Sequence, residues 1–283
     1  MIIKIVIPTY NAGENFKKLI DAMVHQQGIV PADVYIIDSS STDNTAVLAQ
    51  QAGFHVRTIP TQSFSHGGTR AEAVEAIKAE LLVFMTQDAL PATHDAIIKL
   101  CSLLENNPRI GAAYGRQLPY KDTDVFGTHA RLYNYGEQSF VTTLEDRKVR
   151  GIKAAFMSDS FGVYRRSVLL EIGNFTKSLH FGEDTVAAAK MLLAGYQTAY
   201  CAEAQVYHSH TYSCREEFKR YAATGKFHQQ QPWLLAEFGK AEGEGVKFVL
   251  SEGRYLLAQN KWYLLPLMCL RTLCKYAGYM FGK

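Results

Sequence analysis

The sequence predicts an α/β protein with a mostly parallel central sheet flanked by helices, followed by a helical C-terminal extension. Three observations predict this class. Apolar runs typical of strands alternate with helical segments over residues 1–105, and the connections between them are short. The run at 81–85 is apolar at every position, which is typical of a strand buried on both faces of a parallel sheet. Beyond residue 212 the pattern becomes helical and basic.

Each element has a local signal. Apolar and β-branched runs predict strands at 2–7, 34–37, 54–59, 81–85 and 110–118, with a further extended segment at 197–210. The segments between and after them predict helices at 16–24, 45–52, 71–80, 95–105 and 183–194. From Pro119 to about Lys153 we expect an irregular loop rich in polar and aromatic residues. A loop of that length favours a functional role.

Composition narrows the class of protein. The net charge of +3 gives no general attraction to nucleic acid. Five cysteines without a CxxC pair fit a reducing compartment better than a disulfide framework. The first residues enter a strand at once instead of forming a signal peptide, and the apolar stretch at 262–270 is too short to span a bilayer. We therefore expect a cytoplasmic protein.

The C-terminal segment combines apolar and basic residues. No acidic residue follows Glu252, whereas five basic residues do: Arg254, Lys261, Arg271, Lys275 and Lys283. Together with the leucines and aromatic residues between them, this composition suits the headgroup region of an anionic leaflet. The alternative is a terminal helix that packs on the core or on another copy of the chain in a homo-oligomer.

Polar side chains follow the first two strands. Thr9, Tyr10 and Asn11 come after the first strand, and Asp38 and Ser40 after the second. Ligands of open α/β sheets bind at the carboxyl ends of the strands, so these residues are predicted to line a nucleotide crevice. Asp38 could accept a hydrogen bond from N3 of a pyrimidine. The alternative is a local Asx turn or helix cap.

Two later motifs suggest phosphate binding. Gly67 and Gly68 precede a predicted helix, where glycines permit close approach to an anion, and Arg70 would add a directional charged contact. The strand at 81–85 runs into Gln87 and Asp88, and a carboxylate at that strand end is predicted to hold a metal on a phosphate.

The motifs Pro-Thr-Tyr-Asn, His-Gly-Gly-Thr-Arg at 66–70, Thr-Gln-Asp-Ala at 86–89 and Phe-Gly-Glu-Asp at 181–184 together resemble family 2 glycosyltransferases of the GT-A fold. The second and third motifs resemble in particular the enzymes that transfer rhamnose from dTDP-rhamnose. The resemblance covers about residues 1–212, which we expect to form the GT-A domain, with 213–283 as a basic amphipathic extension.

The resemblance implies roles for the remaining candidates. Asp184 would be the general base, with Glu183 beside it in the catalytic pair, although helix capping is the alternative for both. Asp88 matches the last acid of the family's Asp-X-Asp signature, with Thr86 at the first acid. His208 and His210 fall on one face of an extended segment, where either could complete a site for Mg²⁺ or Mn²⁺. Asp159 would bind a sugar hydroxyl.

The implied function is inverting transfer of a sugar, L-rhamnose above all, from its nucleotide to a saccharide acceptor in bacterial surface polysaccharide synthesis. The loop at 119–153 would recognise that acceptor. A lipid-linked acceptor would give the basic tail a purpose at the inner face of the cell membrane. The alternatives are a family 2 enzyme that uses a UDP-sugar or another nucleotide sugar, a nucleotidyltransferase, and a non-catalytic binding or scaffold protein. A nucleotidyltransferase would carry a glycine-rich basic motif where Pro8 to Gly13 stand.

Overall fold

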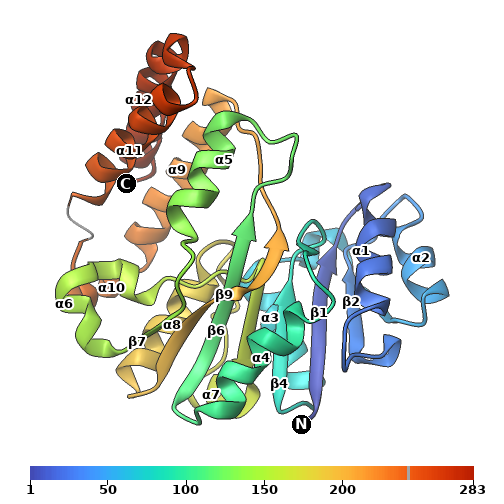
Figure 1. Cartoon of the computed structure of the whole chain (residues 1–283). Coiled ribbons are helices and arrows are strands. Elements are labelled where there is room, and N and C mark those ends of the chain that lie inside the picture. The colour runs from blue at the N-terminus through green and yellow to red at the C-terminus, as the bar shows by residue number, and fades with distance from the viewer. Residues whose placement is uncertain (241–242) are drawn as a thin grey trace. The chain divides into compact units, whose positions relative to one another are not determined.

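The computed structural model describes residues 1–240 and 243–283, and it forms two compact units (Figure 1). The first unit comprises Met1–Gln117, Glu137–Leu144 and Ala155–His208, and the second comprises Leu118–Gly136, Glu145–Ala154 and Ser209–Lys283. The division therefore does not follow the predicted boundary at residue 212, because the helical unit also takes two segments from the middle of the chain.

The first unit is built on a mixed sheet. Among the described residues, nine strands form it: β1 (Ile3–Thr9), β2 (Val34–Asp38), β3 (His55–Thr58), β4 (Leu81–Met85), β5 (Leu90–Pro91), β6 (Ile110–Leu118), β7 (Phe140–Thr142), β8 (Phe161–Arg165) and β9 (Gln197–Tyr207). Their order is β3-β2-β1-β4-β8-β6-β9-β5, and β7 pairs with β9. The four strands predicted in the N-terminal part pair in parallel, with Thr9 beside Asp38 at the ends of β1 and β2.

The prediction of a mostly parallel sheet holds for this half alone. β8 runs antiparallel to both β4 and β6, and β9 runs antiparallel to β5 and β7. A run of buried apolar residues indicates a strand that is covered on both faces but carries no signal for its direction. β8 is almost as buried as its neighbour β4, which is why the sequence pattern did not reveal its direction.

Helices of the first unit are α1 (Asn15–Val24), α2 (Thr45–Gln51), α3 (His66–Ala76), α4 (Ala96–Asn106), α7 (Arg166–Glu171) and α8 (Glu183–Leu193). Buried side chains of α1 and α4, among them Phe16 and Leu100, pack with β1 and β4 in the principal core. Helix α3 begins five residues before its predicted start. The reason is Ser65, whose hydroxyl accepts a hydrogen bond from the Gly68 amide and caps the helix there.

The second unit is helical. It contains α5 (Val125–Asn134), α6 (Arg147–Arg150), α9 (Cys214–Gln230), α10 (Pro232–Phe238), α11 (Glu244–Ala258) and α12 (Leu265–Gly282). The prediction of an irregular loop from 119 to 153 was wrong, because this stretch contains α5, β7 and α6. Phe126 of α5 packs with Leu256 and Met268 in a small core, so tertiary contacts stabilise a helix with little periodic signal of its own.

Close approach of two backbones fixes the terminal helix. A Cβ added to Gly278 of α12 would lie 2.3 Å from the carbonyl oxygen of Phe218 on α9, and one added to Gly282 would lie 2.0 Å from that of Ala222. Ser213 starts α9 with a capping box, in which the Glu216 side chain accepts a hydrogen bond from the Ser213 amide.

Within the described ranges, no helix has the length and apolar character needed to cross a membrane.

Candidate active site

A pocket of about 400 Å³ opens at the carboxyl ends of β1 and β4 in the first unit. It is lined by Thr9 and Tyr10 after β1, by Ser39 after β2, and by Gln87 and Asp88 after β4. The predicted residues Thr9, Tyr10, Gln87 and Asp88 are thus brought together at the strand ends, as the topology of a parallel sheet requires. The other predicted crevice residues, Asn11, Asp38 and Ser40, do not line this pocket. The volume suits a small organic ligand such as a nucleotide.

Hydrogen bonds hold the loops around this pocket in place. The Tyr10 amide donates to the Gln87 side chain at 2.8 Å, and that side chain donates back to the Tyr10 carbonyl. Asn11, in a left-handed conformation, accepts from the Thr42 amide. Ser40 is also left-handed, and its hydroxyl donates to the Ile59 carbonyl. For Asn11, Ser40 and Gln87 the structure gives a role in loop geometry, and nucleotide contact stays a prediction.

Asp38 is almost fully buried, and its carboxylate caps its own loop by accepting from the amide three residues on. Its carboxylate accepts from the Thr9 hydroxyl at 3.1 Å and from the Ser41 amide at 2.9 Å. A local structural role, the alternative anticipated from the sequence, is therefore present. Contact with a pyrimidine remains a prediction that these bonds do not require.

The two glycines of the His-Gly-Gly motif serve packing in this structure. The Gly67 amide donates to the Leu179 carbonyl at 2.9 Å, and a Cβ at Gly67 would lie 2.1 Å from the carbonyl oxygen of Thr176. The Gly68 amide is taken by Ser65. The structure thus gives Gly67 a role in packing, with its amide already paired inside the fold, and the phosphate contact stays a prediction.

Arg70 lies at the floor of the pocket among carboxylates. Its guanidinium pairs with Asp159, at 3.1 Å from Nε to Oδ2, and with Glu183 through Nη1. Tyr164 donates its hydroxyl to the other oxygen of Asp159 at 2.6 Å. Both carboxylate oxygens of Asp159 are thus engaged in a buried network, and its contact with a sugar hydroxyl stays a prediction. A phosphate contact of Arg70 remains a prediction.

Asp184 is the second acid of the Phe-Gly-Glu-Asp motif, in the first turn of α8. It accepts from its neighbour's amide, Thr185, at 2.7 Å, and the Asp159 amide approaches its other oxygen at 3.4 Å. Asp159 in turn contacts Arg70, which lines the pocket that also contains Asp88. Asp184 is therefore linked through Asp159 and Arg70 to the pocket that Asp88 lines, within one unit.

Burial dominates the protonation of this cluster. It raises the pKa of Asp159 to about 6 and that of Glu183 to about 8, although Arg70 pulls both down. Burial likewise raises the pKa of Asp184, against the same guanidinium. Three carboxylates around one guanidinium cannot all ionise cheaply, so the cluster retains a proton into the neutral range. Acids with such values are suited to general base chemistry near neutral pH.

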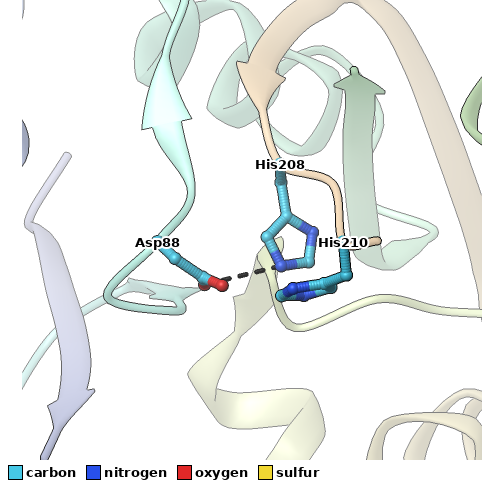
Figure 2. A group of neighbouring side chains, drawn as sticks. All are labelled: Asp88, His208 and His210. Atoms are coloured by element: carbon cyan, nitrogen blue, oxygen red, sulfur yellow. Dashed lines mark ion pairs between the residues drawn. The ribbon is translucent and has the colours of Figure 1, made fainter. Parts of the chain in front are cut away.

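Asp88 faces His208 and His210, two histidines that directly follow β9 (Figure 2). His208 Nε2 lies 3.4 Å from the Asp88 carboxylate, and His210 follows two residues later on the same segment. One potential ligand atom from each of the three residues lies within 4.8 Å of the others. A carboxylate oxygen and imidazole nitrogens fit a divalent transition metal such as Mn²⁺, while Mg²⁺ prefers oxygen ligands.

A second contact orients His208 for such a role. Its Nδ1 lies 2.8 Å from the side-chain oxygen of Gln117, whose amide group donates to the Ser158 hydroxyl at 2.7 Å. Because that amide group is the donor to Ser158, its oxygen faces His208 as an acceptor and places the imidazole proton on Nδ1. Nε2 then carries the lone pair that a metal requires, on the side of Asp88.

Several contributors were missed by the sequence analysis. Phe64 and His66 line the pocket, and Thr86 presents a buried hydroxyl without a hydrogen-bond partner among the described residues. Burial, reinforced by Arg70, lowers the pKa of His66 to about 4, so that it is neutral at physiological pH. Gln117 and Tyr164 had no signal in the sequence, because each lies inside a strand pattern that explains it as a core position.

The fold and this site define a GT-A glycosyltransferase, and the comparisons with known proteins agree. The family model described as Glycosyl transferase family 2 matches residues 4–173. The chain belongs to this family, and it is an enzyme that transfers glycosyl groups. The predictions of family, of fold and of enzymatic class are confirmed.

Two curated proteins are similar over nearly the whole chain. The O-antigen chain rhamnosyltransferase RfbN of Salmonella typhimurium is 45% identical, over 100% of this chain and 90% of that protein. The O-antigen chain rhamnosyltransferase WbaN of Salmonella anatum is 42% identical, over 99% of this chain and 88% of its own length.

Solved structures are similar in fold. The mannosyltransferase PcManGT from Pyrobaculum calidifontis, in complex with GDP-Man and Mn²⁺, has a TM-score of 0.65 at 15% identity and covers 99% of this chain and 87% of its own. Residues 1–349 of S. aureus TarS give a TM-score of 0.59 at 15% identity, over 99% of this chain and 89% of that one.

Proposed function

We propose that this glycosyltransferase transfers L-rhamnose from dTDP-rhamnose, with inversion, to a saccharide acceptor during synthesis of a bacterial surface polysaccharide. The observation that carries the proposal is the connected site, in which Asp88 lines the pocket and Asp184 belongs to the buried cluster at its floor. The names of the two curated relatives support rhamnose as the sugar and O-antigen as the class of product.

Asp184 takes the proton in this reaction. As the acceptor hydroxyl attacks the anomeric carbon from the face opposite the diphosphate, the carboxylate removes the hydroxyl proton and the bond to the diphosphate breaks. Attack from the opposite face inverts the configuration. Asp159 and Arg70 position Asp184 through the contacts described above, and Glu183 holds Arg70 from the other side.

Asp88 and His208, with His210, would hold a divalent cation at the diphosphate. Such a cation supplies charge neutralisation for the leaving group. We favour Mn²⁺ over Mg²⁺ because two of the three donors are imidazole nitrogens. Dialysis against a chelator followed by titration with each metal would test this choice. Binding of Mg²⁺ as tight as that of Mn²⁺, or equal binding of Mn²⁺ by wild type and His208→Ala, would contradict it.

A donor panel tests the sugar and the nucleotide together. Purified enzyme is incubated with dTDP-rhamnose and with several UDP- and GDP-sugars, and release of nucleoside diphosphate is followed. We expect dTDP-rhamnose to be the preferred donor in kcat/KM. Preference for a UDP-sugar would replace the donor in the proposal while leaving the reaction class intact. No turnover of any donor with a range of saccharide acceptors would favour a binding protein instead.

We also propose that the second unit contacts the inner face of the cell membrane, which would bring the enzyme to a lipid-linked acceptor. Although α12 packs on α9, it exposes apolar side chains, with Leu273 at 65% and Phe281 at 79% exposure, and Phe281 also contacts the ring of Phe218 on α9. Trp262, just before α12, is 67% exposed. Lys261 and the absence of acids after Glu252 in the sequence add attraction to anionic lipid.

Flotation with phosphatidylglycerol vesicles tests the membrane contact. Each apolar side chain that enters the interface contributes about 1.5–3 kcal/mol, so the double variant Leu273→Ser, Phe281→Ser should bind at least tenfold more weakly. Val47→Ser, an exposed apolar position on α2, is the matched control and should float like wild type. Equal flotation of all three proteins would remove the proposal.

A further inference from the structure

A second pocket lies within the helical unit, and His210, one of the predicted metal ligands, is among its lining residues. Its volume is about 300 Å³, and all of its lining residues belong to the second unit. Helix α5 contributes Arg131, α9 contributes Arg220, and α12 contributes Arg271 and Lys275. Lys153 completes a set of five basic side chains.

The basic side chains of this pocket exceed the acidic ones by three. The two acids are each met by cations, since Arg271 pairs with Glu217 at 2.7 Å and Lys153 pairs with Glu244 at 2.5 Å. Lys275 lies 3.6 Å from Glu217 as well. The lining therefore carries a net positive charge after both acids are counted.

Arg220 shows how that charge is held. Its guanidinium lies 4.3 Å from the centre of the Tyr212 ring and donates a hydrogen bond to the Tyr212 hydroxyl. These contacts orient the side chain without neutralising its charge, because a phenol and a ring face are both uncharged. Tyr133 and Phe248 add further aromatic surface to the walls.

We infer that this pocket binds the phosphate or diphosphate group of a phosphorylated saccharide acceptor. The inference rests on the proposed function, because it takes the acceptor to be a saccharide. An uncharged sugar would not neutralise the excess positive charge of the pocket, whereas a phosphate ester would. Arginine in particular forms bidentate hydrogen bonds with phosphate oxygens. Aromatic walls suit the apolar face of a sugar ring next to that phosphate.

The nucleotide pocket that Asp88 lines belongs to the first unit, and of the residues that line the second pocket His210 alone is a predicted metal ligand. A membrane lipid headgroup carries the same phosphate chemistry, and the exposed apolar residues of α12 make it the second source. We favour the acceptor because the cations line a pocket with aromatic walls, whereas a membrane surface is met by exposed cations on a flat face.

Titration with inorganic pyrophosphate tests the pocket directly. The full-length protein is titrated calorimetrically in the presence of EDTA, which removes metal-dependent binding. We expect Arg220→Gln and Arg131→Gln each to weaken binding about tenfold, the loss of one charge-assisted contact. Arg215→Gln removes the same charge from an exposed position of α9 outside the pocket and should leave the affinity unchanged. Arg220→Lys, which keeps the charge, should recover part of the affinity.

Three outcomes would overturn the inference: no binding of pyrophosphate by wild type, equal affinity of wild type and both pocket variants, or equal loss with Arg215→Gln. Competition by phosphatidylglycerol vesicles that is lost in Arg220→Gln would overturn the acceptor as the source and assign the phosphate to membrane lipid. Thermal unfolding of each variant confirms that it is folded. Donor turnover is measured separately, so failure of the proposed function does not appear as failure of this pocket.

Discussion

Asp184→Asn should abolish most of the catalysis without unfolding the protein. The substitution keeps the size of the side chain and removes its ability to take a proton. General base catalysis contributes about 10²–10⁴ in rate, which corresponds to roughly 3–5 kcal/mol of the activation barrier. We expect kcat to fall by that factor while the affinity for the donor changes little, because Asp184 is not among the residues that line the donor pocket.

The hydrogen bonds of Asp184 limit the effect on stability. The oxygen of the asparagine side chain can still accept from the backbone amide of Thr185 at 2.7 Å. Its NH₂ group cannot accept from the backbone amide of Asp159, but that bond is already long at 3.4 Å. Removal of such a bond costs about 1 kcal/mol. Against this, the negative charge of Asp184 raises the pKa of both Asp159 and Glu183, so its removal relieves repulsion. The two effects oppose each other, and the free energy of unfolding should change by no more than about 1 kcal/mol.

Single-turnover kinetics with saturating donor measures the first effect, and urea unfolding the second. The pH dependence of kcat gives a further test, because its direction is predicted. Because burial raises the pKa of Asp184, wild-type kcat should fall as the pH drops, through a value above that of an ordinary aspartate. Wild-type turnover by Asp184→Asn, or a loss of activity explained entirely by unfolding, would refute the assignment of the base.

Glu183, Gly278 and Gln117 support three more predictions. The pKa of Glu183 is about 8 in the folded protein against an ordinary 4.5, so the free energy of unfolding of the wild type should fall as the pH rises through this range. Glu183→Gln should flatten this pH dependence in urea unfolding, and an unchanged slope would contradict the prediction. Gly278→Ala forces a Cβ against α9 and should lower the free energy of unfolding by about 1–3 kcal/mol. Gly253→Ala in α11 has room for the Cβ and should raise the free energy of unfolding by up to about 1 kcal/mol. Similar changes in both variants would refute the packing argument. Gln117→Leu removes the partner of His208 and should weaken Mn²⁺ binding about 10–100-fold by calorimetry, with undiminished affinity as the contrary result.

The sequence predicted the N-terminal half of the fold well, because its signals are local. Apolar runs bounded by Gly53 and Pro60 locate β3 and its neighbours to within a few residues. The direction of β8 and the existence of α5 are set by tertiary contacts instead. Helix α5 gains its stability from burying Phe126 and His129, which a single-sequence pattern does not reveal.

Candidate residues of the site were predicted unevenly for the same reason. Asp88 and Asp184 stand at the end of a strand and at the start of a helix, where the topology itself brings functional groups to one edge. The partners that orient a ligand, such as Gln117 beside His208, lie inside strands and have no positional signal. For Asp159 and Gly67 the structure shows internal contacts, and their predicted ligand contacts stay open because a carboxylate or a glycine near a site is compatible with either role.

The His-Gly-Gly-Thr-Arg and Phe-Gly-Glu-Asp motifs are parts of one structural device, although 113 residues separate Arg70 from Glu183. Gly67 allows the first turn of α3 to lie against the backbone at Thr176 and Leu179, at a distance no other side chain permits. Arg70, one turn further along α3, thereby reaches Glu183 at the start of α8. Close backbone packing is thus the reason for a glycine at position 67, and the consequence of this packing is that the charge of Arg70 is placed beside Glu183. One guanidinium placed among buried acids keeps Asp184 ionisable in the pH range where it must accept a proton.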